Sequence, residues 1–163
     1  MKKGFLSVLV LMSLLILSLT ISFVYQQNKD TSTYTRDLYN RKKARYKAES
    51  VLNICYIDNF DQIEEIIIKD YEKMQADRIN YEPNIYTVAA SIDSKNYTMK
   101  ILHISRKDDE KLNDIYRINL SDDIVIGNSQ ADPEYFIKVI DDPDKPGEKT
   151  IKIISKQFYW KNF

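Results

Sequence analysis

The chain has 163 residues, and its 24 Lys and Arg balance its 24 Asp and Glu, so the formal net charge is zero. A neutral chain has no basic footprint for nucleic acid, and no nucleic-acid partner is predicted. Cys55 is the only cysteine, which excludes an intramolecular disulfide, and its place in the apolar run of residues 51–55 predicts that it is buried.

The N-terminal part of the chain contains 21 uncharged residues, from Phe5 to Tyr25, without Gly or Pro. As a helix this stretch would be about 32 Å long, close to the hydrocarbon thickness of a bilayer. Water cannot satisfy backbone groups at that depth, so a transmembrane helix is predicted. Lys2 and Lys3 precede the stretch and predict a cytoplasmic N-terminus, with the rest of the chain outside the membrane.

Three interpretations of the apolar stretch compete. A cleaved secretory signal fits worst, because its apolar core is usually about 7–15 residues and ends at small residues, whereas this stretch runs into Phe23-Val24-Tyr25. A permanent single-span anchor fits the length and the charges. It leaves unexplained why Gly4 lies directly against the apolar stretch, and a leader that is processed at this glycine is the third interpretation.

The junction Lys2-Lys3-Gly4-Phe5 resembles the processing site of type IV pilins and pseudopilins. The resemblance implies that a prepilin peptidase cleaves between Gly4 and Phe5 and that the new amine of Phe5 is N-methylated. The main subunits of that family carry Glu at the fifth mature residue, where this chain has Leu9. A missing Glu is typical of minor pilins and pseudopilins of the PilX or GspK kind.

A second similarity lies in residues 44–50, ARYKAES, which resemble the Ala-rich run of PilX-type N-terminal regions. After Tyr25 the chain turns polar, and residues 26–33 fit either a linker or a continuing helix. We favour the helix, up to about Asp58, because no Gly or Pro occurs from Phe5 to Glu82 and apolar residues recur three or four apart. These residues are Tyr34, Leu38, Ala44, Ala48, Val51, Leu52 and Cys55.

The second half of the chain changes its apolar period from that of a helix to that of a strand. A second amphipathic helix is predicted over residues 60–76, with Asp58 and Asn59 as candidate caps. From Pro83 the period is two, which predicts strands joined by short links as an antiparallel meander. The expected links include a tight turn at Ser94-Lys95-Asn96 and a polar loop at 108–111. The expected strands are 86–92, 97–103, 114–120, 124–126, 134–140 and 150–160.

These elements predict an α+β fold, in which a long N-terminal helix and a short second helix pack on an antiparallel sheet of five or six strands. The resemblance points the same way, because pilins have one long N-terminal helix. The predicted organisation is a prepilin leader (1–4), a transmembrane or filament-core helix (5–25), a helix continuation (26–58) and an α+β extracytoplasmic domain (59–163).

Candidate chemistry is sparse. No constellation of catalytic side chains, cofactor motif or metal-ligand spacing emerges, so no enzyme, no cofactor and no metal site is predicted. His103 falls on the apolar face of a strand, which favours a packed histidine over a base or a ligand. Four carboxylates near a hairpin tip could offer oxygen ligands to Ca²⁺, but the spacing does not fit an EF-hand, and a solvated tip is favoured. They are Asp141, Asp142, Asp144 and Glu148.

The C-terminal run of residues 158–163, FYWKNF, is rich in aromatic side chains. A strand end with one face in the core is favoured over contact with a partner subunit, although aromatic residues are enriched at interfaces.

The resemblance implies a structural subunit of a type IV pilus or a type II secretion-like pseudopilus. Its helix, with Phe5, Leu9, Leu14 and Tyr25, would lie in membrane lipid before assembly and against other pilin subunits in a cell-surface filament afterwards. A prepilin peptidase and the inner-membrane assembly platform are the further partners implied. Because Leu9 cannot pair with the methylated amine of a neighbour, a tip or initiating position is expected.

The alternative is an uncleaved single-pass membrane protein with a small extracytoplasmic domain that binds a partner. The sequence leaves open whether the apparatus is a pilus, a secretion pseudopilus or a DNA-uptake machine, and which ligand the tip contacts.

Overall fold

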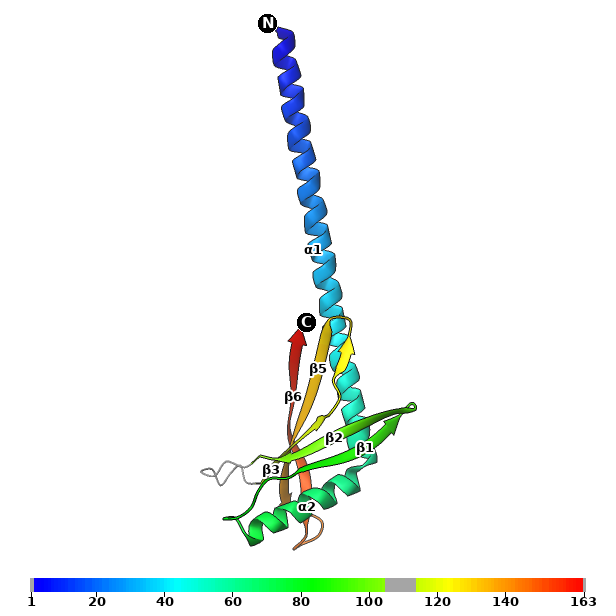
Figure 1. Cartoon of the computed structure of the whole chain (residues 1–163), viewed down its shortest axis with the longest axis vertical. Coiled ribbons are helices and arrows are strands. Elements are labelled where there is room, and N and C mark those ends of the chain that lie inside the picture. The colour runs from blue at the N-terminus through cyan, green and yellow to red at the C-terminus, as the bar shows by residue number, and fades with distance from the viewer. Residues whose placement is uncertain (1, 105–113, 163) are drawn as a thin grey trace. The chain divides into compact units, whose positions relative to one another are not determined.

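The computed structural model describes residues 2–104 and 114–162, with side chains from Phe5 to Ile104 and from Asp114 to Tyr159 (Figure 1). The polar loop expected at residues 108–111 lies outside these ranges. The chain divides into two units, Met1–Tyr39 and Asn40–Phe163.

The first helix, α1, spans Lys2–Asp58 and so belongs to both units. The continuing helix is confirmed, and residues 26–33 are helical throughout. Neither Gly nor Pro interrupts α1 after Gly4, which agrees with its length of 57 residues. The first element of the predicted α+β fold, the long N-terminal helix, is therefore confirmed.

The second helix, α2, spans Phe60–Ala76 and is separated from α1 by Asn59 alone. Asn59 occupies the N-cap position of α2, and its carbonyl oxygen accepts from the backbone N–H of Ile63 at 3.0 Å, but its side chain makes no cap hydrogen bond. Its amide Nδ2 instead donates to the carbonyl oxygen of Cys55, at 3.0 Å, and so satisfies an acceptor in the last turn of α1.

The six expected strands are all present and form one antiparallel sheet. Each begins or ends within a few residues of its expected position, because the alternation of apolar and polar residues fixes which side chains face the core. The strands are β1 (Ile85–Ile92), β2 (Lys95–His103), β3 (Ile115–Leu120), β4 (Ile124–Ile126), β5 (Ser129–Asp141) and β6 (Lys149–Asn162).

The sheet has the strand order β1-β2-β3-β5-β4, with β6 paired to β5, so the expected meander is interrupted where β3 pairs with β5 in place of β4. β1 pairs with β2, and β2 with β3. The long strand β5 pairs on one side first with β3, through Asn119 and Glu134, and then with β4, through Ile124 and Ala131. β6 pairs with the other side of β5 over its whole length, with a bulge between Phe136 and Ile137.

The tight turn between β1 and β2 lies at Asp93-Ser94, and the expected turn at Ser94-Lys95-Asn96 is wrong. Both turn residues have positive φ angles, 49° and 63°, as a two-residue hairpin turn of type I′ requires. Lys95 already belongs to β2, where it pairs with Ile92. Asp tolerates the left-handed conformation better than most residues, which makes this turn possible without glycine.

One core joins the sheet to α2 and to the part of α1 that lies in the second unit (Figure 1). From α1, Ala44, Ala48, Leu52 and Cys55 are fully buried, and the two alanines allow the helix backbone to lie close to the sheet. From β5, the Tyr135 hydroxyl donates to Oδ1 of Asn53 on α1 at 2.5 Å. The burial expected for Cys55 is confirmed, and burial raises the pKa of its thiol, with a smaller contribution from nearby Asp58.

Candidate functional site

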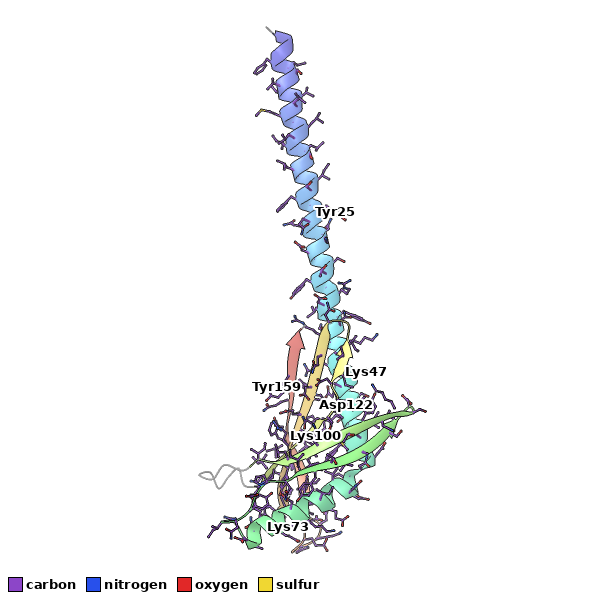
Figure 2. The ribbon with its side chains drawn as sticks, viewed as in Figure 1. Tyr25, Lys47, Lys73, Lys100, Asp122 and Tyr159 are labelled. Carbon is purple, nitrogen blue, oxygen red and sulfur yellow. The ribbon has the colours of Figure 1, made fainter. Side chains whose placement is uncertain are left out.

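The apolar part of α1 exposes its side chains on every side of the helix (Figure 2). The four residues assigned to membrane or filament contact are Phe5, Leu9, Leu14 and Tyr25, with exposed fractions of 71%, 53%, 56% and 71%. Soluble monomers rarely expose apolar surface on this scale. Among the described residues, one helix, α1, has the length and the apolar composition needed to cross a membrane.

Two hydroxyl side chains within the apolar stretch donate to carbonyl oxygens of the helix itself. Ser13 Oγ donates to the carbonyl oxygen of Leu9 at 2.9 Å, and Thr20 Oγ1 donates to that of Ile16 at the same distance. Such back-bonding hides a polar group that would be costly in an apolar medium. These two polar residues are therefore compatible with lipid or with neighbouring apolar helices.

The expected processing junction lies at the start of α1, where Gly4 is described by its backbone alone and Phe5 is the first described side chain. Cleavage and methylation at this junction stay predictions. Leu9, at the place of the family's Glu, offers no carboxylate to a neighbouring amine.

The domain holds a second candidate site, a buried carboxylate on α2. Asp70 follows Ile67 by three residues and precedes Met74 by four, so the helix places it on the buried face, where it is 1% exposed. Tyr86 donates to Oδ1 of Asp70 at 2.6 Å. Tyr116 donates to Oδ2 at 3.0 Å.

A third tyrosine, Tyr81, completes this cluster and donates to Oδ2 of Asp70 at 2.5 Å. Burial raises the pKa of Tyr81 and of Tyr116, and the neighbouring Asp70 carboxylate raises both further. Burial also raises the pKa of Tyr86. All three hydroxyls therefore remain protonated and act as donors over the ordinary pH range.

His103 packs beside the same cluster, and the expected packed histidine is confirmed. It is 3% exposed, and its ring centroid lies 4.7 Å from that of Tyr116 and 5.2 Å from that of Tyr81. Asp70 is not among the functional residues predicted from the sequence. An acidic residue at a core-facing position of the amphipathic pattern is the signal that could have found it.

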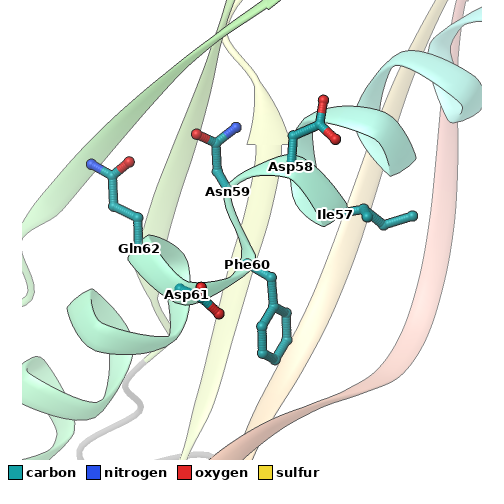
Figure 3. Close-up of a pocket in the computed structure, with 6 residues that line it drawn as sticks. All are labelled: Ile57, Asp58, Asn59, Phe60, Asp61 and Gln62. Atoms are coloured by element: carbon teal, nitrogen blue, oxygen red, sulfur yellow. The ribbon is translucent and has the colours of Figure 1, made fainter.

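In the described part of the domain, two surface cavities are lined mainly by polar residues. One, of about 370 Å³, lies next to the cluster and shares Tyr81 with it. The other, of about 260 Å³, lies where α1 meets α2 and is lined by Ile57, Asp58, Asn59, Phe60, Asp61 and Gln62 (Figure 3). Figure 3 shows the carboxylates of Asp58 and Asp61 on either side of the one-residue link.

Two of the four carboxylates in the acidic hairpin between β5 and β6 are paired with lysines. Lys149 Nζ lies 2.6 Å from Oδ1 of Asp141, and Lys145 Nζ lies 3.4 Å from Oε2 of Glu148. Within residues 2–104 and 114–162, no group of three or more His, Cys, Asp or Glu is placed to hold a metal ion.

The C-terminal aromatic run alternates between the faces of β6 as a strand requires. Phe158 is half-buried, with the Arg45 guanidinium of α1 4.4 Å from its ring centroid, whereas Tyr159 is 49% exposed. The side chains of residues 160–163 lie outside the described part of the chain.

Comparison of the chain with models of protein families, with curated proteins and with solved structures gives no match. The likeness to pilins is one of architecture. A long N-terminal helix is apolar in its first part, and its last part packs on an antiparallel sheet.

Proposed function

We propose that this chain is a structural minor subunit, at the tip or at an initiating position, of a type IV pilus or a type II secretion-like pseudopilus. The observation that carries the proposal is the apolar part of α1, which is exposed on all sides although the same helix continues into the core of the domain. A helix that is apolar all round requires an apolar medium that its own domain does not supply.

In the proposed topology the basic residues Lys2 and Lys3 lie in the cytoplasm and the domain lies outside a single span. After removal of residues 1–4 the helix leaves the lipid and packs among helices of other subunits in a cell-surface filament. This transfer exchanges one apolar environment for another, so it need not be costly. Leu9 cannot make the charge pair that main subunits make with a neighbouring subunit. This favours a position at the tip or at the start of the filament.

The expected partners are other pilin subunits, the prepilin peptidase and the inner-membrane assembly platform, with membrane lipid before assembly. The proposed role is structural, without catalysis. The second candidate is an uncleaved single-pass membrane protein whose domain binds a partner, and the same exposed helix supports it.

Mass spectrometry of the full chain, recovered from cells that contain a prepilin peptidase, separates the two candidates. The proposal expects a chain that begins with N-methylated Phe5. An intact Met1, or a cut near Tyr25, contradicts it.

The variant Gly4→Ala tests the junction itself. We expect residues 1–4 to remain attached in this variant, because the resemblance assigns the cut to the bond after this glycine. Ser7→Ala is the matched control, a change between small residues in the same helix, and it should be processed like the unmodified chain. Equal processing of the two variants contradicts the proposed leader.

A further inference from the structure

Two of the edge strands of the sheet, β6 and β1, differ sharply in charge. β6 carries four lysines, at positions 149, 152, 156 and 161. β1 forms an edge on the opposite side, and its eight residues, IYTVAASI, include no charge and no proline. Lysines and prolines are the usual protection of an edge against pairing with another chain. The β6 edge is protected in this way, and the β1 edge is not.

The turn at Asp93-Ser94 fixes which amides of β1 face away from β2. In a two-residue hairpin the residues flanking the turn, here Ile92 and Lys95, form a hydrogen-bonded pair, and the pairs then alternate. The outward N–H and C=O groups therefore belong to the odd-numbered residues. These are Ile85, Thr87, Ala89 and Ser91, and all four are exposed.

The even-numbered residues of β1 face the core and leave it incompletely covered at this edge. Tyr86, Ala90 and Ile92 pack against the core and remain partly exposed. An additional strand would cover them if its own core-facing residues were apolar. The core-facing residues of a strand that binds this edge should therefore be apolar.

Lys100 indicates which residue type the outer face of the added strand should carry. It lies on β2 opposite Thr87, is exposed, and makes no ion pair with any described residue (Figure 2). Thr87 is small, so the lysine can reach across β1 to a strand about 10 Å away, two strand spacings from β2. An acidic residue on the outer face of the added strand would meet this charge.

We propose that the β1 edge accepts an extended strand from a different subunit of the same assembly, apolar toward the core and acidic opposite Lys100. The proposal rests on the proposed function and names a partner contact for it. A second copy of β1 does not fit this chemistry, because its eight residues include no acidic side chain that could meet Lys100.

Hydrogen exchange tests this contact on the full chain. We compare the chain in its isolated assembly with the same chain extracted as a monomer in detergent. The expected result is that peptides covering residues 85–92 gain protection at the four outward amides on assembly, while residues 149–162 gain none. Equal exchange of residues 85–92 in the two states overturns the proposal.

A variant at the edge gives a second measurement. Ala89→Pro removes one outward N–H, which makes no bond to β2, so the fold should be kept. We expect the amount of chain recovered with the assembly to fall about tenfold, the factor that corresponds to one or two lost backbone hydrogen bonds. Ala89→Val keeps the N–H and is the matched control. Thermal unfolding of both variants checks the fold, and normal recovery of a folded Ala89→Pro chain overturns the proposal.

The N-terminus of the same samples keeps the two proposals apart. A methylated Phe5 without protection of residues 85–92 overturns the strand contact alone. An intact Met1 overturns the proposed function, and protection of residues 85–92 within any membrane complex would still support the contact. Protection that appears in the purified chain as its concentration rises assigns the edge to a second copy and overturns the proposal.

Discussion

Removal of the Asp70 carboxylate should lower the stability of the domain, because three tyrosine hydroxyls donate to it. In Asp70→Ala the hydroxyl of Tyr116, which is fully buried, loses its acceptor at a cost of about 1–3 kcal/mol. Tyr81 and Tyr86 are partly exposed and can turn toward water, so each adds about 0.5–1.5 kcal/mol. The total of about 2–6 kcal/mol is a large share of the usual stability of a domain, about 5–15 kcal/mol.

The isosteric variant Asp70→Asn separates shape from charge. Its remaining oxygen can occupy the position of Oδ2, which accepts two of the three hydroxyls, so we expect a smaller loss of about 1–2 kcal/mol. Glu72→Gln is the matched control, because it removes the same charge from an exposed position of α2. A surface change of this kind should alter the free energy of unfolding by less than about 0.5 kcal/mol.

The assay is urea unfolding of the full chain in detergent micelles, followed by the near-ultraviolet circular dichroism of the tyrosines. Tyr116→Phe gives an internal check, because it removes one donor and leaves Asp70 two others, so its cost should be lower than that of Asp70→Ala. The reasoning is refuted if Asp70→Ala unfolds at the same urea concentration as Glu72→Gln.

Two further predictions concern a glycine and the pH dependence of stability. Gly127 has a φ of +59°, and a Cβ there would lie 2.5 Å from Nδ2 of Asn40, so Gly127→Ala should cost about 1–2 kcal/mol from the backbone alone, and more from the contact. In urea unfolding, adding Asn40→Ala to Gly127→Ala should restore only the stability lost through the contact with Asn40. Gly147→Ala should show no such loss from a contact, because a Cβ there meets nothing within 4 Å. If Gly127→Ala costs the same with Asn40 and with Ala at position 40, the contact is contradicted. Burial raises the pKa of Tyr56 and of Tyr135 from 10.0 to about 12, so their contribution to stability is fully present below pH 10.0 and is lost as the pH rises toward 12. Between pH 10 and 12 the free energy of unfolding should fall by up to about 1.4 kcal/mol per pH unit for each tyrosine. Urea unfolding of Tyr135→Phe should show a smaller decrease with pH, and an unchanged decrease would refute this assignment.

Periodicity predicted most of the fold because the core selects residues by period. The alternation in β1 and β2 and the three-to-four spacing around Leu52 both report which side chains are buried, and burial decides the element. The turn at Asp93-Ser94 was placed incorrectly because neither residue is a glycine. Its left-handed backbone is imposed by the pairing of the two flanking strands.

The Asp70 cluster could not be read from the pattern of apolar residues, for a physical reason. A carboxylate at a buried position looks unfavourable until its donors are known, and Tyr116 lies 46 residues away in the sequence. Only the fold brings Tyr86, from β1, and Tyr116, from β3, to the same two oxygens. Local spacing predicts a buried face, whereas the satisfaction of a buried charge is a property of the tertiary structure.

The helix α1 meets two environments, and the sequence locates both. Leu52 and Cys55 are fully buried by the domain, so the domain covers this face of the helix, although Ile54 and Ile57 remain exposed. Between Phe5 and Tyr25 no face of the helix is covered in this way, since every side chain of the segment is exposed. The second unit, Asn40–Phe163, uses its sheet to bury its own helix segment. The apolar medium of the first segment must therefore come from outside the chain, and lipid and sister helices are the two media that the proposed function supplies in turn.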